Sequence, residues 1–599
     1  MESEKHDRFT ALGGVCLELA VYALLFFTLA VSGYAQGGRA EINGKVMDQS
    51  GAVVPGAKVV ATSAGTGQSR EALASENGTY VLPLLPVGNY TITCTHAGFK
   101  SETHPDVALT ADQKATVDFA LSVGRVTQTV EVSAAAQRIN TTNGAIGQTL
   151  GEEDIKELPL NGRNPAALVF LAPGAVDGMK AQVFTRQDYT TFPTSTGASV
   201  NGGRQGSTYY MLDGANSMDN YSNLASPFPN SDATQEFQVI TNNFDAQYGF
   251  SPGAVVSVVT KSGTNSWHGD AFDFLRNDAL NARDFFAHSR DTLKRNQYGG
   301  SLGGKIVKDK LFIFGNYQGT AEHRIVNSTT AFVPNNKMLN GDFSDLLTGK
   351  AANACGNNGP ANLNFDTGQI FNPATAANFT CPTGSQMAGQ QIVVKQPFAG
   401  NLVNPTLLDP VSMNFENLTL PHTNDPTGFI VIPGAVRIQN YNEFTVKPDW
   451  YISDKSHISG RVFVDSFSHP FETGGGDVLL SDRSWNSTFA NYTVNWLYTI
   501  HPTLLNNLVV GFDQTNASSV PGLRTNKGDP VCFKCLGVNV EENPTTPPGI
   551  DSLGTAGFGF GQNTNIINRH NYSGAETVTW TRGNHLIVAG VNVLDQTWD

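Results

Sequence analysis

The ten residues 491–500, NYTVNWLYTI, carry the pattern that decides the fold of this chain. Apolar or aromatic side chains alternate with polar ones along this stretch, and residues 456–467 show a similar alternation. A period of two residues is typical of a β-strand with one apolar and one polar face. In a soluble β-sandwich the apolar face would point inward, whereas in a transmembrane β-barrel it would point to lipid and the polar face to the lumen.

The spacing of the strand-like segments distinguishes these two arrangements. The pattern predicts nine strands, near residues 267–277, 296–306, 311–320, 440–450, 456–467, 487–500, 504–514, 572–581 and 585–595. Every second connection is only a few residues long, whereas the intervening ones are long, the largest running from about 321 to 439. Short turns on one side and long loops on the other are typical of an outer-membrane barrel whose long loops face outward. Residues 266–599 are therefore predicted to form part of an antiparallel barrel.

Composition argues against two classes of function. The chain has 38 basic and 52 acidic residues, a formal net charge of −14, and no basic run. Such a chain repels phosphate, so nucleic acid is not an expected partner. No window after residue 35 offers the ~20 uninterrupted apolar residues of a membrane-spanning helix, so a helical transporter is not expected.

The N-terminus has the shape of a secretory signal peptide. Residues 20–31 are a 12-residue apolar run, and Gly33 and Ala35 supply small residues before a cut at Gln36. We predict a signal peptide over 1–35 and a mature chain that begins near Gln36. A membrane anchor is the alternative, because acidic residues offset Lys5 and Arg8.

Residues 40–122 contain short strand-like runs separated by turn residues, and are predicted to form a small β-sandwich. The predicted strands are 41–47, 58–62, 79–82, 90–96 and 115–121. The phrases GKVMDQSG (44–51), PGAKV (55–59), NGTY (77–80) and LPVGNY (85–90) closely resemble the carboxypeptidase regulatory-like domain. That resemblance implies a transthyretin-like sandwich, classed among carbohydrate-binding-like folds.

Residues 123–265 combine one helix start, at 151–158, with strand-like runs. The phrases LPLNGRN (158–164), YMLDG (210–214) and AVVSVVTKSGTN (254–265) resemble the plug domain of TonB-dependent receptors, in particular the Oar-like branch. NQYGGSLGG (296–304) and KDKLFIF (308–314) resemble the first barrel hairpin of the same family. The resemblance implies a mostly β chain: a sandwich, a mixed α/β plug and a partial barrel.

The resemblance also implies a function without covalent chemistry. It predicts an outer-membrane TonB-dependent transporter of a Gram-negative bacterium, with the sandwich and plug on the periplasmic side. The implied partners are the TonB complex, outer-membrane lipid and an unidentified extracellular ligand such as an oligosaccharide, a peptide or a chelate. No cofactor is expected. The alternative is a secreted or surface adhesin, or a carbohydrate-binding protein, that performs no transport.

The segment between sandwich and plug is a candidate partner-binding site. Residues 126–132, VTQTVEV, resemble a TonB box, and the candidate contacts are Thr127, Gln128, Thr129, Val130, Glu131 and Val132. A short extended segment of this kind binds by adding a strand to the edge of the partner's sheet. The alternative is an ordinary linker strand of the plug.

Polar residues within and just after the phrase YMLDG are candidates for the ligand-facing apex of the plug. They are Asp213, Asn216 and Asp219, with Asn220 next to them. Their spacing is not that of a calcium-binding EF-hand loop, and such residues are common in turns. No metal site is predicted.

Four of the cysteines are predicted to form disulfide bonds that cross-link loops. Cys532 with Cys535, and Cys355 with Cys381, lie in stretches rich in Pro, Asn and Gly, and are predicted disulfides of an exported protein. Zinc would need further ligands nearby, and none is close. Cys94 lies inside a strand pattern and is predicted to be a buried thiol.

Two motifs suggest catalysis or phosphate binding only superficially. GFSPG (249–253) matches a serine nucleophile elbow, but the β-branched run that follows it predicts a strand where the elbow needs a helix. Residues 299–305 have the glycines and lysine of a phosphate loop without its Ser or Thr, and are predicted to form a glycine-rich hairpin. No zinc-peptidase motif occurs, and no enzyme is expected.

The strand count predicts that these residues are part of a longer barrel. Bacterial single-chain barrels have even strand numbers, and nine strands cannot close around a plug of roughly 140 residues. An open sheet would leave two edges in hydrocarbon, where each unsatisfied backbone group costs several kcal/mol. We therefore expect the 599 residues alone to fail to assemble.

Overall fold

The computed structural model describes residues 38–598, with gaps at 125–128, 132–143, 179–191, 193, 220, 250–251, 284, 286–289, 291, 326–328, 433–435, 470–481, 523–530, 533, 538–564 and 584. The predicted signal peptide lies outside these residues, as do Thr127, Gln128, Val132 and Ser251. Within the described part of the chain, no helix is long and apolar enough to cross a bilayer.

The N-terminal domain, residues 38–124 with the strand at 129–131, is a β-sandwich. One sheet has the order β4-β1-β7, with β8 also paired to β1, and the other has the order β3-β2-β5-β6-β9. The strands are β1 (Arg39–Asp48), β2 (Lys58–Ser63), β3 (Ser69–Leu73), β4 (Thr79–Pro86), β5 (Gly88–Thr95), β6 (Ser101–Leu109), β7 (Lys114–Thr116), β8 (Phe119–Leu121) and β9 (Thr129–Glu131). Buried apolar residues such as Ile42, Ile92 and Phe119 form the core between the sheets. The predicted sandwich is confirmed.

Two strands of this domain do not show the expected sequence pattern. β3 is short and charged, and β6 contains Pro105 and the buried polar residues Glu102 and His104. Glu102 Oε1 lies 3.0 Å from His104 Nε2, and its Oε2 accepts a hydrogen bond from the Ala120 N–H at 3.0 Å. Because these polar groups are satisfied by partners, they can occupy inward positions where a hydrophobic pattern was expected.

The plug, residues 144–265, is built on a five-stranded sheet of order β10-β17-β18-β13-β14. Its larger elements are β10 (Ile146–Gly151), α2 (Glu152–Glu157), η1 (Asn161–Arg163), η2 (Pro165–Leu171), β13 (Thr208–Leu212), β14 (Ala215–Asn216), β17 (Thr234–Asn242), η3 (Ala246–Tyr248) and β18 (Ala254–Thr260). The smaller strand pairs are β11 (Ala175–Asp177) with β12 (Ala198–Val200), and β15 (Met218–Asp219) with β16 (Leu224–Ala225).

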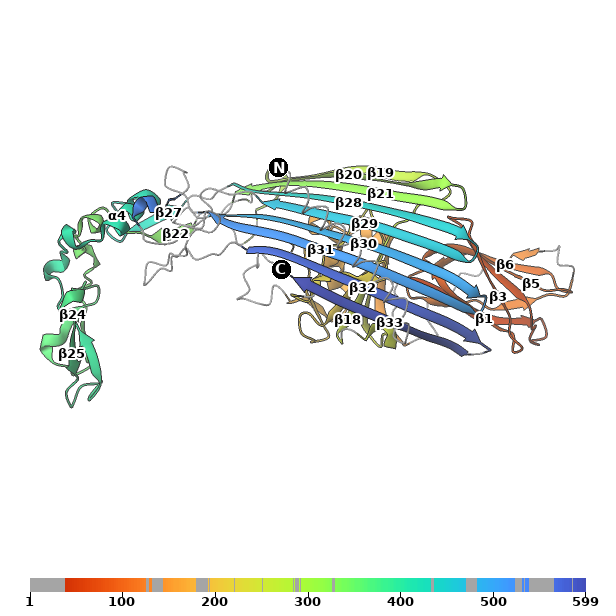
Figure 1. The fold of residues 1–599 in the computed structure, drawn as a ribbon, viewed down its shortest axis with the longest axis horizontal. Coiled ribbons are helices and arrows are strands. Elements are labelled where there is room, and N and C mark those ends of the chain that lie inside the picture. Colours follow the sequence, from red (N-terminus) through yellow and green to blue (C-terminus); the bar gives the residue numbers. More distant parts are fainter. Residues whose placement is uncertain are drawn as a thin grey trace, which may run out of the picture.

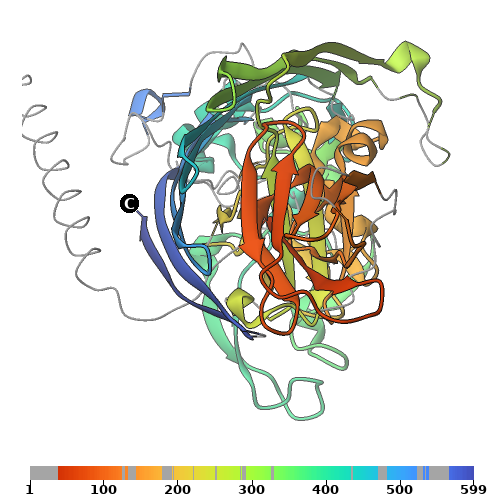
Figure 2. The same ribbon diagram turned by 90° about the vertical axis from the view of Figure 1, so that its right-hand side faces the viewer.

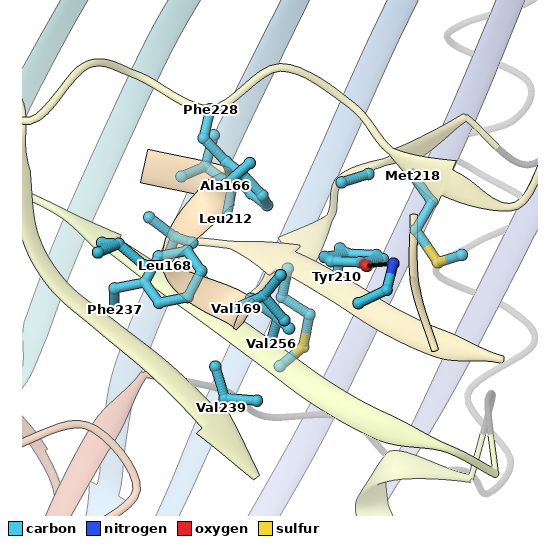
Figure 3. Packing of buried hydrophobic residues seen from close by; sticks show 14 of the residues in the cluster. Ala166, Leu168, Val169, Tyr210, Leu212, Met218, Phe228, Phe237, Val239 and Val256 are labelled. Atoms are coloured by element: carbon cyan, nitrogen blue, oxygen red, sulfur yellow. Dashed lines mark hydrogen bonds between the residues drawn. The ribbon is translucent and has the colours of Figure 1, made fainter. Parts of the chain in front are cut away.

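The core of the plug packs between its sheet and η2. Leu168, Val169, Tyr210 and Phe237 are buried there, and the Ala198 N–H donates to the Tyr210 hydroxyl at 3.0 Å (Figure 3). The predicted helix start corresponds to α2, with acidic residues in its first turn. β18 follows the GFSPG motif as a strand, as predicted.

The third part, called the wall, is a nine-stranded antiparallel sheet. Its strands are β19 (His268–Asn277), β20 (Lys294–Val307), β21 (Leu311–Ile325), β28 (Val436–Ser453), β29 (Ser456–His469), β30 (Asp482–His501), β31 (Leu504–Gly522), β32 (Asn565–Arg582) and β33 (His585–Trp598), in that order across the sheet. All nine predicted strands are present. The wall curves around the plug as an open arc, and the N-terminal domain lies at one end (Figures 1 and 2).

Burial along β30 shows which face of the wall is inward. Asn491 and Thr493 are 1% and 4% exposed, whereas Val494 between two polar neighbours is 51% exposed. The polar face therefore lies against the plug and the apolar face points away from it. This is the barrel arrangement and the reverse of a soluble sandwich.

The strands extend further than predicted. Eight of the nine contain 14 to 20 residues. Most of the extra length lies at the end of the wall that carries the long connections, for example at 436–439 and 565–571. The hydrogen-bonded ladder joins backbone groups, so the length of a strand is not limited to the stretch in which the side chains alternate regularly.

The segment 299–305, predicted to form a glycine-rich hairpin, lies in the first strand of the β20–β21 hairpin. Its glycines lie inside β20, and the turn comes later, between Val307 and Leu311. The reason for glycine is close packing: a Cβ at Gly304 would lie 2.3 Å from the Trp267 ring, and one at Gly299 would lie 2.1 Å from the Tyr317 carbonyl oxygen. These glycines allow neighbouring groups to approach a strand.

The longest connection forms an arm that projects from the end of the wall opposite the N-terminal domain (Figure 1). Its strand pairs are β22 (Thr329–Phe332) with β27 (Phe429–Ile432), β23 (Ala351–Asn353) with β24 (Asn364–Asp366), and β25 (Ala377–Thr380) with β26 (Gln391–Val394). Its one α-helix among the described residues is α4 (Pro410–Thr419).

Both predicted cysteine pairs are joined in the structure. Cys355–Cys381 staples the arm, and Cys532–Cys535 closes a small loop that contains the turn η11 (Lys534–Leu536). Cys94 is a buried free thiol in β5. Because α4 packs against η11, the two long connections contact each other.

Candidate functional site

The contact between plug and wall is centred on Asp213. This residue follows β13 in a left-handed conformation, with φ of 50°, and its carboxylate accepts hydrogen bonds from Thr260 N at 2.9 Å and Thr260 Oγ1 at 2.6 Å. From the wall, Lys447 Nζ lies 3.3 Å and Arg461 Nη1 lies 2.9 Å from the same carboxylate. A single plug carboxylate therefore pairs with two wall cations.

The burial of this cluster makes it energetically important. The Arg461 side chain is 1% exposed and that of Asp213 is 13% exposed. Burial favours a raised pKa for Asp213, but the charges of Lys447 and Arg461 outweigh it, and the pKa is lowered. A buried charge that loses its partner is strongly destabilising. The carboxylate therefore serves to hold the plug against the wall.

A second ion pair joins plug and wall at Asp219. Its carboxylate lies 2.6 Å from Arg569 Nη1 in β32, and both side chains are buried. The Arg569 guanidinium also stacks over the Tyr221 ring, 4.3 Å from its centroid. Next to it, Asn571 Nδ2 donates to the Met218 carbonyl at 3.2 Å.

These contacts change the interpretation of the predicted plug apex. Asp213 and Asp219 are occupied by wall cations, and Asn216 is buried with its Oδ1 accepting from the Met218 N–H at 2.9 Å. The structure therefore places Asp213, Asn216 and Asp219 in buried contacts, where they do not form an open ligand-facing surface. In the described residues, no group of three or more His, Cys, Asp or Glu side chains is placed to hold a metal ion.

The LPLNGRN phrase forms a third contact, with the first strands of the wall. Arg163 pairs with Asp232, and its guanidinium lies 4.2 Å from the ring centroid of Phe272 and 4.4 Å from that of Phe274. Asn161 Oδ1 accepts from Arg295 Nη1 at 2.9 Å. This phrase therefore makes a docking loop, which its resemblance to a plug did not indicate.

Aromatic residues of the wall were missed by the sequence analysis. Phe463, Phe467, Trp485 and Phe489 point inward and join the buried core of the plug. The Phe467 ring centroid lies 4.9 Å from that of Trp485 and 6.4 Å from that of Phe192 in the plug. These four aromatic residues occupy strand positions where the alternation would place polar residues. That departure from the alternation was the sequence signal that could have identified them.

The N-terminal domain is seated on the short turns of the wall. Arg39 Nη2 donates to Asn495 Oδ1 at 3.2 Å, and Arg70 Nη1 donates to Thr499 Oγ1 at 2.8 Å. Near the β20–β21 turn, Asn265 Nδ2 donates to the Thr66 carbonyl at 2.8 Å. The domain therefore lies at the end of the wall opposite the arm.

The same domain also contacts the plug. The Ala111 N–H donates to Glu236 Oε2 at 2.6 Å, and Gln238 Nε2 donates to the Ala111 carbonyl at 3.0 Å. Burial raises the pKa of Glu236 to about 8 and that of Asp112 to about 7. Two carboxyl groups at this interface thus retain protons more strongly when the domain is docked.

We expect docking to weaken as the pH rises. Undocked, the two carboxyl groups return to their ordinary values of 4.5 and 3.8, so the docked state binds more protons. The stabilisation is complete below about pH 4 and is lost as pH rises through the docked pKa values. Spin labels on the N-terminal domain and the plug, measured by pulsed electron resonance at pH 6 and pH 9, will report the docked fraction.

The matched variant for this prediction is Glu236→Gln. Glutamine keeps a carbonyl acceptor for the Ala111 N–H but does not ionise, so the loss of docking between pH 6 and pH 9 should be smaller. A docked fraction that rises with pH, or a pH response unchanged in the variant, would contradict the prediction.

The candidate TonB box is only partly described. Thr129–Glu131 form β9, which pairs in parallel with β6, Val130 lying opposite Glu102. β9 is therefore an edge strand of the N-terminal sandwich. The alternative interpretation, a linker strand of the plug, is not what these three residues form. The Val130 side chain is 39% exposed.

Comparison with protein families gives two matches. The model of the family described as "Outer membrane beta barrel domain" matches residues 259–599. The model described as "Carboxypeptidase regulatory-like domain" matches residues 41–122.

Similar individual proteins include a curated relative and several solved structures. The "TonB-dependent transporter Oar" of Myxococcus xanthus is 26% identical over 280 residues, which are 43% of this chain and 24% of the relative. The match thus spans about a quarter of that relative's length. The siderophore receptor PirA of Acinetobacter baumannii has 11% identity and a TM-score of 0.39, over 76% of this chain and 48% of that one. The ferric enterobactin receptor PfeA of Pseudomonas aeruginosa has 11% identity and a TM-score of 0.39, over 77% and 50%.

Proposed function

Because the chain belongs to the outer membrane beta barrel domain family, we propose that it is a TonB-dependent transporter, which imports an extracellular ligand across the outer membrane. The observation that supports the proposal is a plug enclosed by the curved wall. The polar face of the wall lies against the plug, and its apolar face points away from the plug. A binding protein needs no such plug, whereas a transporter needs one that seals a lumen until it is displaced.

The plug contacts suggest how such a transporter would be held closed. Asp213 and Asp219 form buried ion pairs with three cations on β28, β29 and β32. Opening a path between plug and wall requires these pairs to separate, which is costly at buried positions. An external force is therefore needed, and we assign that force to the TonB complex.

The orientation follows from the two ends of the wall. The N-terminal domain lies at the short turns and would face the periplasm, while the arm lies at the long connections and would face outward. The arm and the loop closed by Cys532–Cys535 are then the first described parts to meet a ligand. We propose that β9 and its flanking residues receive the TonB protein.

Uptake by the native host tests this proposal. A strain that lacks the gene should fail to use one nutrient in a panel of glycans, peptides and iron chelates, and a strain without TonB should lose the same nutrient. Complementation with the gene should restore uptake in the first strain only. A deletion that impairs surface attachment and leaves all uptake intact would instead favour an adhesin.

A further inference from the structure

A cavity of about 650 Å³ lies where the N-terminal domain, the plug and the wall meet. Charged residues from all three parts line it, including Arg39 and Arg70 of the N-terminal domain, Asp213 of the plug and Arg461 of the wall. The cavity lies away from the outer loops, and the proposed transport uses only its Asp213–Lys447–Arg461 cluster.

Most of the charges in this cavity compensate one another. Two of the lining carboxylates have cationic partners: Asp213 has Lys447 and Arg461, and Glu152 has Lys261 at 2.9 Å, whereas Asp449 lies 3.4 Å from His457, a buried side chain that is not a fixed cation. The fourth, Asp454, is exposed in the short turn between β28 and β29. The three lining cations Lys261, Lys447 and Arg461 therefore balance the three carboxylates Glu152, Asp213 and Asp449 in sum.

Arg39 and Arg70 are the exceptions. In the described part of the chain, neither forms an ion pair with a carboxylate, and their recorded partners are the neutral side chains Asn495 and Thr499. Arg39 Nη1 is buried and has no hydrogen-bond partner among the described residues. The carboxylates of Asp449 and Asp213 act on Arg39 only through space, so its buried guanidinium is left without a directly bound anion, which is unfavourable.

Both guanidinium groups are held away from water, and the charge of Arg39 acts on Arg70. Burial lowers the pKa of Arg39, and burial together with the charge of Arg39 lowers the pKa of Arg70 to about 10. Burial away from water is the common cause, the positive charge of Arg39 adds to it at Arg70, and the nearby carboxylates of Asp449 and Asp213 oppose it at Arg39. An anion between them would relieve both.

We propose that this cavity binds a small molecule through a carboxylate or phosphate group held by Arg39 and Arg70. The planar guanidinium fork matches two oxygens of either group, which makes arginine suited to both. Both arginines belong to the N-terminal domain and also contact the wall. A bound anion would therefore stabilise the association of that domain with the wall. The site stands on its own geometry and does not depend on transport.

Calorimetric titration of the purified full chain in detergent tests the site. Inorganic phosphate and citrate are the two probes, used at low ionic strength because screening weakens such contacts. We expect at least one probe to bind the wild-type chain, and the double variant R39Q/R70Q to bind it at least tenfold more weakly. The probe that binds identifies the chemical group.

The control variant is Lys45→Gln, which removes an exposed cation of the same domain outside the cavity. Its affinity should equal that of the wild type. Protection of the buried Cys94 thiol from alkylation, read by mass spectrometry of its peptide, verifies that each variant is folded. Equal binding by R39Q/R70Q, or no binding of either probe to wild-type chain with protected Cys94, would overturn the proposal.

Discussion

Replacing Val130 by proline is expected to abolish capture of the chain by the C-terminal domain of TonB. Val130 is the middle residue of β9, an edge strand whose outer side has no neighbour in the described sheet. An exposed edge can accept a partner strand through main-chain hydrogen bonds. Proline removes a backbone N–H and holds φ near −65°, which disrupts an extended segment. Pull-down with immobilised TonB C-terminal domain measures the loss.

The matched control is Val130→Thr, which keeps the backbone N–H and a β-branched side chain. It should be captured as well as the wild type, and both variants should keep Cys94 protected from alkylation. Binding of an extracellular ligand should survive in both, because β9 lies at the opposite end from the arm. Undiminished capture of the proline variant would place the partner-binding segment elsewhere.

Replacing Asp213 by alanine should loosen the plug by about 3–5 kcal/mol, the usual cost of leaving a buried charge without its partner. Lys447 and Arg461 would both lose their shared carboxylate, and Thr260 would lose its hydrogen-bond acceptor. Native-state hydrogen exchange of the β13 and β18 amides measures the effect as faster opening of these strands.

Two further variants identify the cause of that loss. Glu153→Ala removes an exposed carboxylate from α2 of the plug and should leave exchange unchanged. The triple variant D213A/K447M/R461M removes the charges on both sides and should recover most of the protection, because apolar replacements of buried ion pairs are often neutral. Wild-type exchange rates in D213A would show that the plug is held by other contacts.

Local patterns predicted the positions of the wall strands well. The alternation in 491–500 and the short connections located all nine strands and the polarity of the sheet, because strand period and turn length are properties of neighbouring residues. Strand ends were less predictable, because the backbone ladder of β28 and β32 is not set by the alternation of side chains. β6 was missed because its buried Glu102 and His104 satisfy each other.

The candidate site depends on contacts between distant residues, which local sequence patterns do not predict. The sequence alone identified Asp213 and Asp219 as candidate functional residues of the plug, and predicted that one face of the wall strands is polar. Only the tertiary structure decided that Asp213 meets Lys447 and Arg461, and that Asp219 meets Arg569. Those partners are 234, 248 and 350 residues away along the chain. Their pairing depends on how the plug is seated in the curved sheet, and that seating is set by the packing of all three parts together.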